Sequence, residues 1–197
     1  MTTGKIIAFI IIALCLIIQY VVLPIRNARW RKKPLHNFKF FWRGQEFWYS
    51  RACAATHFVF CKNTEGKWCI LANKRGIGTP DFQGFWNASC GYLDFNESGE
   101  QCAQRETYEE TGLFVPLEEI KFWNVNTHPS ANKQNVTLRY VSVLHDKNCD
   151  TFKMATDNSE ENEVAEIKWI PIDEVENYGW AFNHKEIILS VFNKIEK

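Results

Sequence analysis

A capped helix that carries clustered glutamates is the feature that most constrains how this chain can fold. Ser98 and Gln101 have the spacing of a capping box, in which each side chain bonds the backbone N–H of the other residue. Gly112 suits the position just past the last turn, where a left-handed backbone ends many helices. The sequence therefore predicts a helix of about 13 residues, roughly 20 Å long, between these two signals.

Three glutamates crowd one face of this predicted helix. At about 100° per residue, Glu106, Glu109 and Glu110 fall within an arc of about 100°, with Arg105 at its border. Like charges at this spacing repel by roughly a few tenths of a kcal/mol per pair. Charge clustering alone leaves two interpretations open: a solvated acidic face, or a site for a hard cation such as Mg²⁺, which takes oxygen ligands.

The charge distribution argues against a nucleic-acid binder. The chain has 23 basic and 23 acidic side chains, but six of the basic ones and none of the acidic ones lie in residues 1–34. The remaining residues carry 17 basic and 23 acidic side chains, a net charge of −6. Because phosphate contacts need Lys and Arg, we expect no nucleic-acid partner for this acidic part of the chain.

Residues 6–25 form an apolar run of 20 residues without a formal charge. A helix of that length covers the hydrocarbon core of a bilayer, about 30 Å thick. A cleaved signal peptide and a buried core helix are the alternatives. The run is longer than the apolar region of a signal peptide, and it lacks the polar stripe of a core helix. We therefore predict a short tail over 1–5, a transmembrane helix over 6–25 and a basic linker over 26–37.

Flanking charge and cysteine usage predict the orientation of this single-pass helix. Five basic residues follow the apolar run, whereas Lys5 alone precedes it, so the positive-inside rule places the C-terminal domain in the cytoplasm. The seven cysteines include no CxxC pair and read as thiols in a reducing compartment. Three glycosylation sequons occur, and a glycan on Asn96 would obstruct the acidic stretch, which also favours a cytosolic domain.

The rest of the chain predicts one α/β (α+β) domain over residues 38–197. Aromatic residues over 38–50 suggest a hairpin that turns at Gly44, with a juxtamembrane belt as the alternative. Strands are expected at 54–61, 68–73, 85–91, 121–126, 136–144 and 166–170, and short helices at 172–177 and 184–195. Interleaved strands and helices without a second linker favour a single layered domain.

The acidic stretch also matches a known motif. Seven of its residues have fixed spacing: Gly91, Glu97, Arg105, Glu106, Glu109, Glu110 and Gly112. The stretch resembles the Nudix box, G-x5-E-x7-R-E-U-x-E-E-x-G-U, in which U is usually aliphatic. Such a match arises by chance about once in 10⁸ start positions. The single departure is Thr107 at the first U, and the preceding WNASCGYLD run is also similar to Nudix enzymes.

The resemblance implies a fold, a reaction and a metal site. The fold is a mixed sheet between helices, and the reaction is Mg²⁺- or Mn²⁺-dependent hydrolysis of a nucleoside diphosphate linked to another group. Glu106, Glu109 and Glu110 would be the metal ligands, with Glu97 acting through water and a backbone carbonyl near Cys90 or Gly91 joining them. Arg105 would pair with Glu97 to hold the helix against its loop. By the same resemblance, catalysis is assigned to Arg105 and Glu109.

Family members often add a carboxylate from a later loop. Glu160, Glu161, Glu163 and Glu166 are candidates for this catalytic base. We choose Glu163, because a base must reach the attacking water within about 3 Å and only a loop position can swing in. The scattered histidines, among them His57 and His184, fit core or surface positions better than ligand positions.

The sequence also leaves other interpretations open. The glycine-rich segment 75–84 matches no phosphate-loop pattern and suggests a flexible rim. The main prediction is a membrane-anchored Nudix hydrolase. Its alternatives are a non-catalytic Nudix-fold binding or scaffold module, which a degraded box would signal, and an enzyme directed at RNA caps, which would need a basic RNA path. The base, the sugar and the leaving group of the substrate are left open, as are the membrane and the oligomeric state.

Overall fold

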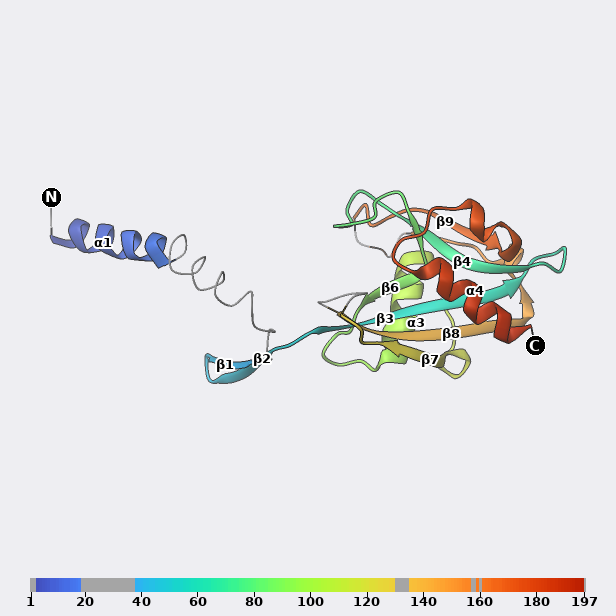
Figure 1. The fold of residues 1–197 in the computed structure, drawn as a ribbon, viewed down its shortest axis with the longest axis horizontal. Helices are drawn as coiled ribbons and strands as arrows, with labels where there is room; N and C mark the ends of the chain where they lie inside the picture. Colours follow the sequence, from blue (N-terminus) through green and yellow to red (C-terminus); the bar gives the residue numbers. More distant parts are fainter. Residues whose placement is uncertain (1–2, 19–37, 130–134, 157–158, 160, 197) are drawn as a thin grey trace. The chain divides into compact units, whose positions relative to one another are not determined.

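The structure, a computed structural model, describes residues 3–18, 38–129, 135–156, 159 and 161–196. The chain divides into two compact units, Met1–Ser50 and Arg51–Lys197. The first unit contains helix α1 (Thr3–Ile17) and strands β1 (Phe38–Trp42) and β2 (Gln45–Tyr49). The second unit contains all the other helices and strands of the described residues (Figure 1).

Strands β1 and β2 form the antiparallel hairpin predicted for residues 38–50. The turn lies at Arg43 and Gly44, whose φ angles of +50° and +78° are the two positive values that a tight two-residue hairpin turn requires. The turn at Gly44 is therefore confirmed. The hairpin belongs to the first unit, whereas the domain predicted over residues 38–197 included it.

The transmembrane helix predicted over residues 6–25 is not confirmed. Helix α1 has 15 residues and ends at Ile17. Within the part of the chain that the structure describes, no helix is both long and apolar enough to cross a membrane. Most of the predicted C-terminal half of the span, from residue 19, and the whole predicted linker over 26–37 lie outside the described residues.

The second unit is built on a mixed sheet of seven strands. Their order is β5-β4-β3-β8-β7, with β6 also pairing with β3 and β9 with β4. The pair β3 and β8 is parallel, and the other pairs are antiparallel. The strands are β3 (Ala52–Lys62), β4 (Trp68–Arg75), β5 (Trp86–Asn87), β6 (Ser89–Tyr92), β7 (Lys121–Asn126), β8 (Asn135–Asn148) and β9 (Val164–Pro171).

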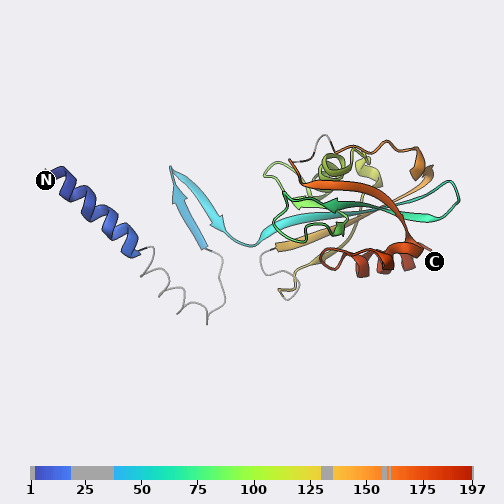
Figure 2. The same ribbon diagram turned by 90° about the horizontal axis from the view of Figure 1, so that it is seen from above.

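Helices α3 (Gly99–Thr111) and α4 (His184–Ile195) cover opposite faces of this sheet, as Figure 2 shows. One core lies between the sheet and α3, where Cys102 and Ala103 pack against residues such as Val59. The other core lies between the sheet and α4, where Ile188 and Val191 join residues such as Phe60. The predicted sheet between helices is therefore confirmed.

The predicted elements correspond closely to the observed ones. Every predicted strand overlaps an observed strand, and the segment 85–91 is divided into β5 and β6. The helix predicted at 184–195 is α4, whereas 172–177 forms the 3-10 helix η4 (Ile172–Asn177). Two further 3-10 helices, η2 (Leu117–Glu119) and η3 (Cys149–Thr151), were not predicted, because one turn leaves no periodic signal.

The sheet face beneath α4 changes chemistry along its length. Phe58 and Val141 pair across β3 and β8 and belong to the core under the helix. One step of two residues back along each strand, on the same face, lie Thr56 and Arg139. These polar residues line a cavity beyond the N-terminal end of α4, so the alternation of the two strands provides both a core and a polar cavity floor.

Candidate active site

Helix α3 forms between the signals predicted for it. Ser98 accepts a hydrogen bond from the backbone N–H of Gln101, and the Gln101 side chain accepts one from the N–H of Ser98. Gly112 has a φ of +74° and donates its N–H to the carbonyl of Tyr108. The helix has 13 residues. The predicted capping box and C-terminal glycine are both confirmed.

Thr107, the departure from the aliphatic pattern, fastens α3 to the sheet. Its Oγ1 lies 2.8 Å from Nδ1 of His57 on β3, and Nε2 of His57 lies 2.8 Å from Oγ of Ser142 on β8. All three side chains are buried. Burial lowers the pKa of His57 to about 3, so the ring is neutral at pH 7. His57 is thus a core residue, as expected, and a hydroxyl suits this position because an imidazole faces it.

Arg105 is the centre of the charged network beside the helix. Its Nε and Nη2 donate to the two carboxylate oxygens of Glu97 at 3.0 and 2.7 Å, a bidentate pair that joins the helix to the preceding loop. Its Nη1 also donates to Glu106 at 2.7 Å and to Glu109 at 2.9 Å. Hydrogen bonding by Arg105 lowers the pKa of Glu97. The expected Arg105–Glu97 pair is present, while its catalytic role stays a prediction.

Two carboxylates of α3 are buried where their charge is unfavourable. Burial raises the pKa of Glu106 to about 7 and places the pKa of Glu110 well above its usual value. Glu163 adds a repulsive charge to both. One oxygen of Glu110 accepts hydrogen bonds from the Asn73 side chain at 2.6 Å and the Cys90 backbone N–H at 3.3 Å. This cluster of oxygens would gain stability from a cation.

The carboxylates fit a hard divalent ion by their chemistry, although the described residues form no ready-made ligand shell. In the described part of the chain, no group of three or more His, Cys, Asp or Glu side chains is arranged to hold a metal. Arg105 contributes to this, because it bonds one oxygen each of Glu106 and Glu109. Glu109, whose side chain is 38% exposed, has room to turn toward a cation. Of the four predicted metal ligands, three bond Arg105: Glu97, Glu106 and Glu109. The fourth, Glu110, is buried and is influenced by the charge of Glu106.

Gly91 leaves space for one of these carboxylates. A Cβ at this position would lie 1.9 Å from Oε1 and 2.1 Å from Cδ of Glu106. Any side chain at residue 91 would therefore displace the Glu106 carboxylate. This contact explains the glycine that begins the motif, and it places the backbone of Gly91 beside a predicted ligand.

The four distal carboxylates have different surroundings. Glu163 and Glu161 line the cavity next to α3, and the charge of Glu163 influences both buried glutamates. Glu166 is exposed on β9 and lies 3.8 Å from Lys74. Glu160 lies outside the described residues. Glu163 therefore lies in the cavity near the two buried glutamates, and its role as the base stays a prediction.

The loop that carries Glu163 is seated on the glycine-rich segment 75–84. Gly76 donates its N–H to the carbonyl of Glu163 at 2.6 Å, and Gly78 donates to that of Asn162 at 2.8 Å. A Cβ at Gly76 would lie 2.0 Å from the Asn162 carbonyl oxygen. The segment does line the cavity, as a rim would. Its glycines let the backbone of this segment pack closely against the backbone of the loop that carries Glu163. The predicted flexible rim did not include this packing role.

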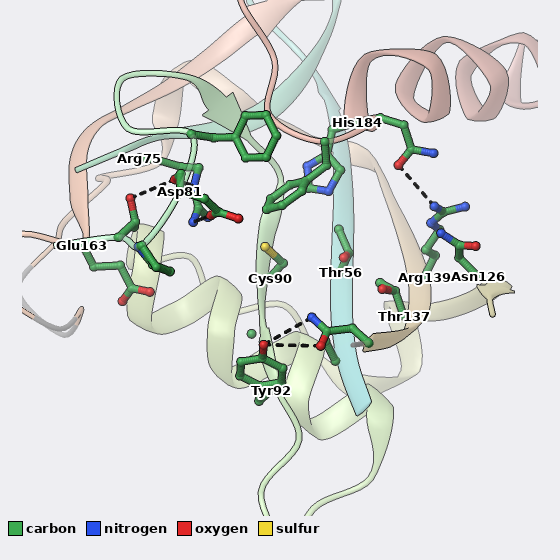
Figure 3. A pocket seen from close by; sticks show the side chains of 18 of the residues that line it. Thr56, Arg75, Asp81, Cys90, Tyr92, Asn126, Thr137, Arg139, Glu163 and His184 are labelled. Atoms are coloured by element: carbon green, nitrogen blue, oxygen red, sulfur yellow. Dashed lines mark hydrogen bonds and ion pairs between the residues drawn. The ribbon is translucent and has the colours of Figure 1, made fainter. Parts of the chain in front are cut away.

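A cavity of about 790 Å³ lies between these loops and the polar face of the sheet (Figure 3). That volume lies in the ordinary range for small-molecule sites. Glu163 and Arg139 lie on opposite sides of the cavity, with Cys90 and Thr56 between them in this view. The cavity therefore has an acidic side next to α3 and a basic side on β8.

Several cavity residues were not found by sequence reasoning. Phe82 and Phe182 line the cavity with ring centroids 4.8 Å apart, and the Arg75 guanidinium lies 5.3 Å from the Phe182 ring. His184 is buried, with a pKa lowered to about 3 by burial. The aromatic residues come from separate irregular loops, where no periodic pattern marks them.

Comparisons with known proteins agree with this fold. A family model described as the NUDIX domain matches residues 53–191. The chain is 30% identical over 105 residues to a putative mutator protein, MutT4, of Mycobacterium tuberculosis. That match covers 50% of this chain and 38% of the relative, so the chain spans well under half of the relative's length.

Two solved structures share the fold. The NUDIX domain of Shewanella oneidensis NrtR, complexed with ADP ribose, is similar with a TM-score of 0.62 and 20% identity, over 75% of this chain and 90% of that one. A bifunctional NMN adenylyltransferase/ADP ribose pyrophosphatase of Francisella tularensis, complexed with AMP and a Mn ion, gives 0.57 and 16%, over 85% and 45%. With the match to the family model over most of its length, the chain belongs to the Nudix family.

Proposed function

We propose that this chain is a pyrophosphohydrolase that cleaves the diphosphate bond of a nucleoside diphosphate linked to another group, with Mg²⁺ or Mn²⁺ as cofactor. The observation that carries the proposal is the pair of buried carboxylates, Glu106 and Glu110, beside a cavity that a third carboxylate, Glu163, also lines. Two structural neighbours described above were solved with ADP ribose and with AMP and a Mn ion. Those ligands support a nucleotide substrate and a divalent cofactor.

The proposed roles of the residues follow from their positions. Glu106, Glu109 and Glu110 would hold the ion, with Glu97 acting through water. A bound divalent ion would neutralise the diphosphate charge and lower the pKa of a bound water. The carboxylate of Glu163 would accept the proton of the attacking water from the cavity side. Arg105 would keep the helix and its loop in register through the bidentate pair with Glu97.

The first prediction concerns the reaction itself. The full chain should hydrolyse at least one member of a panel of nucleoside diphosphate derivatives, and the activity should require added Mg²⁺ or Mn²⁺. Product masses would identify the bond that is cleaved. Activity that persists in EDTA would contradict the metal requirement. Binding of nucleotides without any turnover across the panel would favour the non-catalytic binding module instead.

The second prediction separates the base from the metal ligands. Glu163→Gln should lower kcat by about 10²-fold, within the usual range for loss of a general base, while the Mg²⁺ concentration that gives half-maximal activity changes little. Glu161→Gln is the matched control, because that exposed residue lines the same cavity from the same loop. If the control loses as much activity as Glu163→Gln, or Glu163→Gln keeps the wild-type kcat, the assignment of the base is wrong.

We also propose that residues 6–25 anchor the chain in a membrane with the catalytic unit in the cytoplasm. The support is the uncharged run of 20 residues and the five basic residues that follow it. Replacing Arg29, Arg31, Lys32 and Lys33 with neutral residues should give a mixed orientation, measured by protease protection of sealed vesicles with a C-terminal tag. Wild-type protein that is protected when the cytoplasmic face is exposed to protease would overturn this topology.

A further inference from the structure

Arg139 on β8 is a cation in the cavity that the proposed reaction does not use. Its Nη1 donates to the side-chain oxygen of Asn124 at 3.4 Å, and its Nη2 donates to that of Asn183 at 3.3 Å. Both partners are neutral amides. These two bonds use two of the five N–H donors of a guanidinium. Figure 3 shows Arg139 beside Thr137 and Asn126, across the cavity from Glu163.

The charge of Arg139 has no acidic partner among the described residues. All the ion pairs found there involve other side chains, and none includes Arg139. Arg75, the other arginine of the cavity, bonds Asp81 at 2.7 Å. Arg139 is half-buried, and desolvation lowers its pKa. A guanidinium that is partly removed from water without a counter-ion is costly, and an anion in the cavity would offset that cost.

The N-terminal end of α4 adds to this positive side of the cavity. Asn183 is the N-cap residue of α4, a position from which asparagine usually accepts a bond from the first-turn N–H groups. Here the Asn183 side chain makes no such bond and accepts from Arg139 instead. Asn183 and His184, the first helical residue, both line the cavity. The partial positive charge of the helix end therefore lies on the same side as the guanidinium.

We propose that Arg139 binds an anionic group, a phosphate monoester or a carboxylate, on the part of the substrate that lies away from the scissile diphosphate. This inference rests on the proposed function, because the diphosphate is assigned to the acidic side of the cavity by Glu106, Glu110 and Glu163. The two sides then select different features of one molecule. The acidic side recruits the ion that takes the diphosphate, and Arg139 selects derivatives with a second negative group.

The test uses pairs of diphosphate compounds that differ only in the remote anion. NADPH with NADH and coenzyme A with dephospho-coenzyme A differ by a phosphate monoester, and UDP-glucuronate with UDP-glucose differs by a carboxylate. For at least one pair, the wild-type kcat/KM should be tenfold or more higher for the member that carries the remote anion (called the anionic member below). Arg139→Gln should abolish that ratio, mainly by raising KM for the anionic member, with a much smaller effect on the member that lacks the remote anion. Lys147→Gln, on the same strand, is the control and should keep the ratio.

A second variant distinguishes loss of the anion site from a folding defect. Asn183→Asp places a carboxylate of the same shape on the guanidinium at the 3.3 Å contact, and aspartate is as good an N-cap as asparagine. This variant should lose the ratio while its melting temperature is kept or raised. The proposal is overturned if no pair is distinguished by the wild type, or if Arg139→Gln lowers kcat/KM equally for both members.

The same experiment separates this proposal from the proposed function. Metal-dependent hydrolysis without discrimination within any pair would leave the function intact and remove the role of Arg139. If no compound is hydrolysed, the proposed function fails, and equilibrium binding of the same pairs in EDTA still tests Arg139. Tenfold tighter binding of an anionic member, lost in Asn183→Asp, would support the subsite. Equal binding of both members of every pair would overturn it.

Discussion

Glu110→Gln should lower kcat by at least about 100-fold while the protein stays folded, an effect comparable to the loss of one strong electrostatic stabiliser. Glu110 is 3% exposed, and its pKa is raised by burial. A group whose acid form is favoured in the fold destabilises the folded state when it is charged at pH 7. The glutamine keeps the shape and removes that buried charge, so the metal-free variant should be no less stable than the wild type. The lost charge should weaken the proposed ion site.

The measurement pairs kinetics with thermal unfolding. The wild type should gain melting temperature when Mg²⁺ is added, because an ion that binds only the folded state stabilises it, and Glu110→Gln should lose most of that gain. Glu166→Gln is the matched control, since this glutamate is exposed on β9 and contacts Lys74 at 3.8 Å. A Glu110→Gln enzyme with wild-type kcat would remove Glu110 from the ligand set.

Helix α3 could be predicted from the sequence because its signals are local. The capping box at Ser98 begins the helix and the left-handed Gly112 ends it. The hydrogen bonds that cap the helix at each end reach residues three or four positions away. The strands follow for a similar reason, since their apolar residues are continuous or alternate along a few positions. The pairing of Arg105 with Glu97 was expected from the motif. The two residues are only eight positions apart, in one loop and the helix that follows it.

The rest of the site could not be predicted because it is assembled by tertiary contacts. Arg139 and Asn183 are separated by 44 residues, and they meet only because β8 runs beneath the start of α4. The backbone hydrogen bond from Gly76 to Glu163 joins two loops, and no sequence pattern links these loops. Thr107 looked like a departure from an aliphatic position, and its partner His57 lies 50 residues earlier. The packing of helices and loops against the sheet places these residues together.

Gly91→Ala should abolish most activity while it leaves the fold in place. The new Cβ would lie 1.9 Å from Oε1 of Glu106, far inside any allowed contact. The atoms that it meets are the end of a flexible side chain, so the carboxylate can turn away without moving the backbone. β6 stays paired with β3 because Gly91 lies opposite Ala55 in an ordinary antiparallel register. The substitution therefore moves a proposed ligand without breaking a core contact.

We expect a loss of kcat/KM of about 100-fold, as for removal of the ligand charge itself, together with a rise in the Mg²⁺ concentration that gives half-maximal activity. Gly179→Ala is the control, because its Cβ would make ordinary contacts of 3.4 and 3.5 Å with the ring of Phe85. Both variants should unfold near the wild-type temperature without metal, and only Gly91→Ala should lose stabilisation by Mg²⁺. If Gly91→Ala keeps the metal response of the wild type, the Glu106 carboxylate does not hold the ion, because its present position is the one that the Cβ would fill.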